Sequence, residues 1–255
     1  MDQVINLEVI SPNEFKGQVR LVLQPAAEQP GMTAPGKEAG DIRLTDAGGE
    51  NKPATAVVSL GPQAKIDAEA YRRAGAGVAH WLAINRVSQA GLDLSGILGS
   101  DLVSATGALS EGLLLGAFRF DRYKTPSEEP VKTRLSLITS DGAETVKQAV
   151  ERATIVAQAV NLAREWAHEP PNVVNPITLV EKVQALAAET GLKCTVLDDK
   201  QLEKKDRLIN EPIQFLVGQN RVRYEVVVNW VQKDKAGGYL SIPKDKSLSA
   251  ERSTK

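Results

Sequence analysis

The sequence predicts an α/β fold in which short strands alternate with helices. Runs rich in β-branched residues recur along the first half of the chain, and alanine, leucine and valine repeat at helical spacing between them. The composition, with 42% hydrophobic and 25% charged residues, is that of an ordinary globular protein. Because alternating strands and helices favour a layered α/β domain, we expect one large or two small domains of this kind in the 255 residues.

The first strands are expected at Val19–Leu23 and Ala56–Leu60, which are short β-branched runs. The stretch 24–53 between them is rich in glycine, proline and aspartate, so it predicts a hairpin or a long loop. After the second strand, apolar residues at helical spacing predict a helix over Asp67–Asn85.

Two glycines, Gly75 and Gly77, lie inside this expected helix. Each costs about 1 kcal/mol relative to alanine in a helix interior, so we expect this helix to pack closely against a sheet. The same periodicities then predict three further elements: a strand at Gly91–Leu98, a helix at Ala105–Phe118 and a strand at Leu135–Ile138.

The longest helical pattern covers Ala143–Ala167. This helix must end by Glu169, because Pro170 and Pro171 remove two backbone donors and disfavour helical geometry in the residues before them. We expect the helix to pack through one apolar stripe. The stripe consists of Val146, Val150, Ile155, Val156, Val160 and Leu162.

The two prolines mark the expected boundary between domains. We predict an N-terminal domain over residues 1–168, a linker over 169–175 and the partial start of a second domain over 176–232. Residues 233–255 are rich in lysine and serine and poor in apolar residues, which predicts a disordered tail.

The second domain opens with a helix cap. Asn175 is expected as the N-cap, and Pro176 follows it at the first helical position. The helix is expected to run to Thr190 and to close at Gly191, and a strand at Lys193–Leu197 follows. This order predicts the beginning of a second α/β unit.

Charge and cysteine usage exclude several classes of function. The formal net charge of −1 and the pI of about 6.2 give no field that would attract nucleic acid or an anionic membrane, so neither is expected as a partner. The single cysteine, Cys194, excludes an intrachain disulfide, and its apolar neighbours predict a buried thiol. No leader pattern opens the sequence, and no window approaches the roughly 18 apolar residues of a membrane span. We therefore expect a cytoplasmic protein.

Residues with catalytic or ligating chemistry are few and scattered. For His80, in the first expected helix, a packed or surface position is favoured over a metal ligand. For His168, at a helix C-terminus, contact with the carbonyl ends is favoured over catalysis. Asp198 and Asp199 can cap a short helix through Leu202, and such neighbouring carboxylates are commonly solvated. We assign no catalytic, cofactor-binding or metal-binding residue in this chain.

Three segments resemble one enzyme family. Residues 163–204, AREWAHEPPNVVNPITLVEKVQALAAETGLKCTVLDDKQLEK, resemble the passage from the N-terminal to the catalytic domain in leucyl aminopeptidases, also called cytosol aminopeptidases. Glu111–Thr125, EGLLLGAFRFDRYKT, and Ala68–Ala79, AEAYRRAGAGVA, are similar to parts of the family's N-terminal domain. The resemblance extends over about residues 19–205.

The resemblance implies a macro-domain-like N-terminal α/β domain followed by a truncated second α/β unit, in a homo-oligomer that is hexameric in the family. The family's activity releases N-terminal amino acids from peptides and requires two divalent metals, Mn or Zn. The family's carboxylate-rich motifs and its arginine motif are missing here. The nearest segment, KDKAGGYLSIPKDK at Lys233–Lys246, has Pro243 where the family has lysine. No metal cofactor is therefore expected for this chain alone.

Three hypotheses follow. The preferred one is a catalytically incomplete family member, composed of the N-terminal domain and a stub of the catalytic one. The second is an aminopeptidase subunit that is active only with complete subunits or as part of a longer product, so that peptide is a substrate only if a catalytic domain is supplied. The third is a macro-like ligand-binding or interaction module, because related folds bind nucleotides at strand ends.

Overall fold

A computed structural model of the chain describes most residues up to 197 and two short strands beyond them. The described residues are 4–26, 36–50, 52–97, 102–125 and 130–197, together with the backbone of 213–217 and 222–226. The chain divides into two compact units, Met1–Glu169 and Pro170–Lys255.

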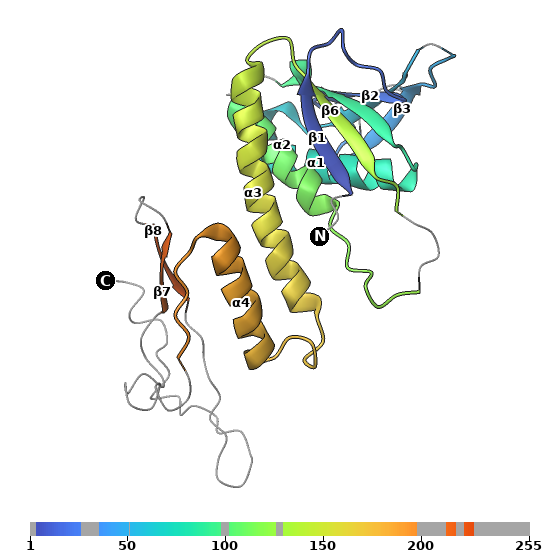
Figure 1. Cartoon of the computed structure of the whole chain (residues 1–255). Helices are drawn as coiled ribbons and strands as arrows, with labels where there is room; N and C mark the ends of the chain where they lie inside the picture. The colour runs from blue at the N-terminus through green and yellow to red at the C-terminus, as the bar shows by residue number, and fades with distance from the viewer. Residues whose placement is uncertain are drawn as a thin grey trace. The chain divides into compact units, whose positions relative to one another are not determined.

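A six-stranded mixed sheet forms the centre of the first unit (Figure 1). Its strands are β1 (Ile5–Ile10), β2 (Val19–Gln24), β3 (Ile42–Asp46), β4 (Ala54–Ser59), β5 (Gln89–Asp93) and β6 (Thr133–Ile138). In the order β1-β6-β5-β2-β4-β3, the first five strands are parallel, and β3 pairs antiparallel with β4 at one edge. This arrangement confirms the expected α/β class.

The strands expected at Val19–Leu23, Ala56–Leu60 and Leu135–Ile138 are confirmed as β2, β4 and β6. The described part of the stretch between β2 and β4 contains one strand, β3, which forms an antiparallel hairpin with β4 and not with another strand of the stretch. The strand expected at Gly91–Leu98 is shorter than predicted, because β5 ends at Asp93 and a single 3-10 turn follows it.

No prediction covers β1, the strand at the edge of the sheet next to β6. The two strands meet from distant parts of the chain: the Ser136 hydroxyl donates a hydrogen bond of 2.7 Å to the carboxylate of Glu8, 128 positions away. A parallel pairing over such a separation has no local turn signal in the sequence. β1 can therefore be recognised only from its pairing with β6, and not from local sequence.

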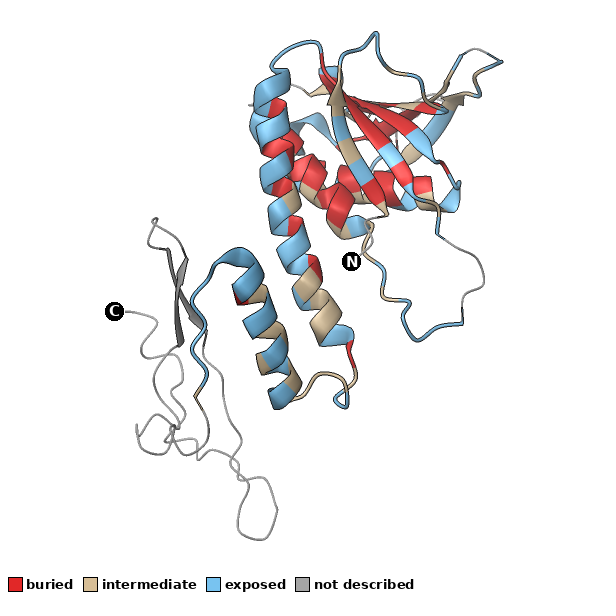
Figure 2. Cartoon of the chain, viewed as in Figure 1, coloured by how far each residue is buried: buried red, intermediate tan, exposed pale blue. Residues whose placement is uncertain are grey.

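Three helices complete the first unit: α1 (Ala68–Ile84), α2 (Leu102–Gly116) and α3 (Ala143–His168). They confirm the three expected helices. α1 begins after Asp67, whose carboxylate accepts a hydrogen bond of 2.9 Å from the amide of Ala70. α1 and α2 pack against the sheet, and α3 packs along α2 and β1 (Figures 1 and 2). The largest fully buried side chains of this core include Tyr71, Leu82, Leu109, Leu113, Leu21, Leu92 and Leu135.

α1 and α2 approach each other closely enough for their backbones to touch. A Cβ atom on Gly75 would lie 2.2 Å from the carbonyl oxygen of Leu109, and one on Gly112 would lie 2.0 Å from the carbonyl oxygen of Arg72. Gly77 meets the backbone of Gly40 in the same way, at 2.3 Å. α1 packs against the sheet as expected, but the close approach at the two glycines is to a helix and a loop and not to a strand.

α3 packs through small residues, and the expected apolar stripe is buried only as far as Val150. Val146 and Val150 are buried as predicted, whereas Ile155, Val156 and Val160 are 68%, 42% and 41% exposed. α3 is about 39 Å long, and its line of buried residues departs from the predicted apolar stripe. Its members beyond Val150 are Ala153, Ala157 and Asn161. Small side chains let α3 lie close to α2, so Ile155, Val156 and Val160 remain on the exposed side of the helix. Figure 2 shows buried and exposed residues alternating along α3.

The second unit contains α4 (Pro176–Thr190) and a hairpin of β7 (Ile213–Val217) and β8 (Val222–Val226). The cap predicted for α4 is confirmed: the Asn175 side chain accepts from the amides of Ile177 and Thr178, and the Thr178 hydroxyl lies 3.0 Å from the amide of Asn175. At the other end Gly191 adopts a left-handed conformation with φ 71°. Both ends of α4 therefore follow from its sequence.

Two predictions beyond α4 were wrong. Lys193–Leu197 forms no strand in the described part of the chain, and Cys194 is exposed instead of buried. Without a ladder partner this segment has no sheet face under which the thiol could pack. Asp198, Asp199 and the short helix expected through Leu202 lie outside the described residues. In the described part, no helix is long and apolar enough to cross a membrane.

Candidate functional site

The candidate site lies where the first unit ends. The segment that follows α2, Ala117–Lys124, contacts the last two turns of α3 through hydrogen bonds, ion pairs and ring contacts. Both partners belong to segments on which the family resemblance rests. We call the five residues Arg122, Tyr123, Glu165, His168 and Glu169 the joint cluster.

Glu169 is the centre of the joint cluster. Its side chain is fully shielded from solvent, and its carboxylate accepts hydrogen bonds from the Arg122 guanidinium and, at 2.5 Å, from the Tyr123 hydroxyl. Its amide donates to the carbonyl oxygens of Glu165 and Trp166 at the end of α3. A buried carboxylate requires such partners, because burial without them disfavours the charged form.

Arg122 also binds the carboxylate of Glu165, one helical turn before Glu169. Two carboxylates at this spacing on a helix repel each other, and the single guanidinium between them offsets that repulsion. The neighbouring Glu169 carboxylate also raises the pKa of Tyr123, mainly because the phenol donates a hydrogen bond to it. The hydroxyl therefore stays protonated and acts as a donor throughout the physiological pH range.

The final carbonyl groups of α2 are satisfied by side chains of α3. Asn161 donates to the carbonyl oxygen of Leu114 at 3.1 Å, and Arg164 donates to that of Leu115 at 3.0 Å. The Arg164 guanidinium also lies 4.2 Å from the centre of the Phe118 ring. Because helix ends leave carbonyl groups without intrahelical donors, these contacts fix the end of α2 against α3.

The two histidines do not meet. His168 is at the C-terminal end of α3, and its Nδ1 donates to the carbonyl oxygen of Arg164 at 2.7 Å, which confirms the predicted contact with carbonyl ends. Its ring packs against Phe118 and Phe120, with ring centres 5.8 and 5.4 Å away. His80 is exposed on α1 and lines an open cavity, in agreement with the surface position allowed for it.

The joint cluster can hold the chain in place, but it has no arrangement for covalent chemistry. Both oxygens of its buried carboxylate accept hydrogen bonds from an arginine and a tyrosine, so neither is free to take a proton from a substrate. Tyr123, Arg122, Glu165 and Glu169 were not predicted as a site. The available signal was that Arg122 and the two glutamates have opposite charges and lie in two of the segments that resemble the family. The sequence alone does not show that these segments are in contact.

Comparison with known proteins connects this fold to one family. Residues 33–127 match the model of the N-terminal domain of the cytosol aminopeptidase family. A probable cytosol aminopeptidase of Syntrophotalea carbinolica is 39% identical over 176 residues, which are 67% of this chain and 35% of that protein. One of Aquifex aeolicus is 34% identical over 169 residues, 66% of this chain and 33% of that protein. The chain spans about a third of the length of these curated relatives.

Solved structures show the same fold. A mutant of tomato leucine aminopeptidase matches with a TM-score of 0.65 and 16% identity over 79% of this chain and 46% of that one. The bottromycin maturation enzyme BotP matches with a TM-score of 0.61 and 21% identity, over 74% of this chain and 41% of that one. These structures show the fold, and the sequence matches show the family. The chain belongs to the cytosol, or leucyl, aminopeptidase family, as the sequence predicted, and it contains the family's N-terminal domain.

Proposed function

We propose that the first unit is a non-catalytic domain of a cytoplasmic aminopeptidase. In this proposal, the release of N-terminal amino acids from peptides belongs to a catalytic half, and the first unit holds the end of α3, from which the chain continues toward that half. The observation that carries the proposal is the buried Glu169 carboxylate, which Arg122 and Tyr123 bind directly before Pro170. The names of the relatives, probable cytosol aminopeptidases, supply the reaction class.

Two divalent metals, Mn or Zn, would supply the activated water in such a catalytic half. The described residues do not fit that centre: they contain no group of three or more His, Cys, Asp or Glu side chains that could hold a metal ion. We therefore assign no catalytic step to these residues. Their contribution in the proposal is to orient the chain that leads to the catalytic half.

An assay of the purified chain tests the non-catalytic role. The chain is incubated with leucine p-nitroanilide and added Mn²⁺ or Zn²⁺, with a complete cytosol aminopeptidase as the positive control. We expect no hydrolysis above the metal-only background. Metal-dependent turnover by this chain alone would contradict the proposal, and turnover that needs added complete subunits would favour the alternative of an accessory subunit.

Limited proteolysis tests the holding role of the joint cluster. The residues Pro171 and Asn172 are exposed. A protease cleaves the peptide bonds there only when this segment unfolds locally from the conformation that the joint cluster holds. We expect faster cleavage between residues 170 and 175 in Arg122→Gln and Glu169→Gln than in the unchanged chain. A matched replacement at Arg152, exposed on α3, should leave the cleavage rate unchanged.

We also infer that the first unit takes part in a homo-oligomer. The outer face of α3 carries the branched side chains of Ile155, Val156 and Val160, and an exposed apolar group of this kind on a soluble domain commonly marks an interface. Sedimentation of the purified chain checks this inference. We expect association that the double replacement Ile155→Glu and Val160→Glu abolishes; a monomer at high protein concentration would contradict it.

A further inference from the structure

An open cavity of about 180 Å³ lies in the first unit, at the edge of the sheet where β1 and β6 begin and where α1 and α2 end. Its walls combine apolar side chains with polar groups and come from several elements. They include Val4, Ile5, Ala79, Ala83 and Ala117. The hydroxyl of Thr133, which also lines the cavity, already donates to the carbonyl oxygen of Val87 at 2.7 Å.

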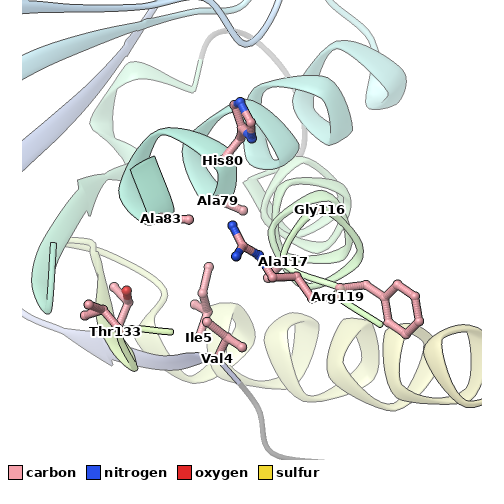
Figure 3. A pocket seen from close by; sticks show the side chains of 11 residues that line it. Val4, Ile5, Ala79, His80, Ala83, Gly116, Ala117, Arg119 and Thr133 are labelled. Atoms are coloured by element: carbon pink, nitrogen blue, oxygen red, sulfur yellow. The ribbon is translucent and has the colours of Figure 1, made fainter. Parts of the chain in front are cut away.

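One cation projects into this cavity. Figure 3 shows the guanidinium of Arg119 between Ala79 and Ile5, with the backbone of the residue coming from the segment after α2. Among the described residues, no hydrogen bond or ion pair binds this guanidinium. Arg20, Arg122 and Arg164 of the same unit each bind an acceptor. A guanidinium has five N–H donors and no acceptor, so Arg119 offers donors to a ligand beside the alanine and valine side chains. Its charge also helps to lower the pKa of Asp121, after the hydrogen bond from Lys124.

We propose that this cavity is a binding site for a short aliphatic carboxylate. A guanidinium binds a carboxylate with two parallel hydrogen bonds, and Arg119 supplies that fork. The alanine and valine side chains then cover the aliphatic chain of the ligand. His80 also lines the cavity. Nothing in the peptidase reaction proposed above uses this site.

The size of the cavity selects the ligand. A cavity of about 150 Å³ holds benzene, which has six heavy atoms, so 180 Å³ suits a carboxylate with four to six carbon atoms. Pockets for drug-sized ligands measure roughly 300–1,000 Å³, which is larger than this cavity. A single guanidinium also matches one carboxylate better than the several charges of a phosphate chain. Both an acid such as 3-methylbutanoate and an amino acid such as leucine carry this shared chemistry.

Nuclear magnetic resonance titration of the ¹⁵N-labelled chain tests the site. The probes are 3-methylbutanoate, leucine and leucinamide, which share the branched chain; leucinamide lacks the carboxylate. We expect saturable shifts of the amides of Ala79, Ala83 and Ala117 with at least one of the two carboxylates and none with leucinamide. Shifts with 3-methylbutanoate identify a simple acid site, and shifts with leucine alone identify an amino-acid site.

Three variants complete the test. In Arg119→Gln, which replaces an exposed side chain, we expect at least a tenfold loss of affinity for the carboxylate. Ala83→Leu, which fills the cavity, should abolish binding while amide spectra confirm that the unit stays folded. Arg152→Gln, the exposed control on α3, should bind as the unchanged chain does. The proposal is overturned if neither carboxylate binds, if leucinamide binds equally well, or if Arg119→Gln binds with unchanged affinity.

Discussion

The hydroxyl group of Tyr123 lies 2.5 Å from a carboxylate oxygen of Glu169, so the segment that follows α2 is bound directly to the last residue of the first unit. Arg122, the neighbour of Tyr123, binds the other oxygen of the same carboxylate. Adjacent residues thus hold both oxygens of one buried side chain. This contact joins two parts of the chain that are 46 and 47 positions apart.

Replacement of Glu169 by Gln should destabilise the first unit. The amide keeps the shape of the side chain but removes the charge that the Arg122 guanidinium binds. The side chain of Arg122 is 50% exposed, so solvent screens the lost attraction, and we expect a loss of about 1–2 kcal/mol in the free energy of unfolding. Urea unfolding followed by circular dichroism measures it. Glu165→Gln is the control: its carboxylate is more exposed, at 17%, and the loss should be smaller. An equal loss in both variants would contradict the central role of Glu169.

Two glycine-to-alanine replacements should have opposite effects on stability. A methyl group at Gly75 would collide with the backbone of α2, and neither backbone can move aside without separating the helices. We expect Gly75→Ala to destabilise by about 2–3 kcal/mol. Gly107, inside α2, has no atom within 4 Å of an added Cβ, so Gly107→Ala should stabilise by about 0.5–1 kcal/mol. Thermal unfolding of both variants checks the pair. A loss of stability in Gly107→Ala would contradict the open space that the structure shows beside Gly107.

Acid should weaken the sheet through Asp93. Burial alone raises the pKa of this carboxyl group, but hydrogen bonds from Ser95 and the Arg20 guanidinium, 2.5 Å away, outweigh burial and lower the pKa below its ordinary value. A lowered pKa stabilises the folded state above the ordinary pKa, near 4, and this contribution is lost as the pH falls through the folded-state pKa.

Unfolding free energies from pH 6 down to pH 3 should therefore fall more steeply in the unchanged chain than in Asp93→Asn. The Arg20 side chain is 37% exposed, so solvent screening limits the difference to about 1 kcal/mol. Glu151→Gln, a neutral replacement on the exposed face of α3, should keep the steep slope of the unchanged chain. Parallel slopes for Asp93→Asn and the unchanged chain would contradict the role of Asp93.

The cap of α4 offers a local test in the second unit. Asn175→Ala removes the oxygen that accepts hydrogen bonds of 3.1 and 3.2 Å from the amides of Ile177 and Thr178. Loss of such a cap costs about 1 kcal/mol, so amide exchange in the first turn of α4 should accelerate about fivefold. Asn175→Ser keeps an accepting oxygen and should retain most of the protection. Equal exchange rates in the two variants would mean that the cap does not hold the turn.

The elements that the sequence predicted well carry their signals within a few neighbouring residues. α4 is the clearest case, because Asn175, Pro176 and Gly191 mark both of its ends. α1 is similar, with Asp67 at its start and Asn85 at its end. Such caps act on adjacent backbone groups, so no tertiary information is needed to recognise them.

The features that escaped prediction depend on distant partners. β1 forms only beside β6, and the exposure of Ile155 on α3 follows from the small residues that α3 presents to α2 instead. The joint cluster needs Tyr123 and Glu169 to meet, and no periodicity relates those positions. The same holds for the cavity at Arg119, whose walls come from four separate elements. Sequence patterns predicted the family and the helices, whereas tertiary contacts determined both sites.

The pairing of β1 with β6 sets an order of events during synthesis on the ribosome. Residues Glu8 and Ser136 face each other across this pair, 128 positions apart. At translation rates of roughly 5–20 residues per second, the N-terminal strand waits on the order of ten seconds before its partner has been made. Until then β1 has no ladder to join, and its edge is open to other chains or to a chaperone. A nascent chain arrested before residue 133 should therefore be more prone to misassociation than one arrested after α3.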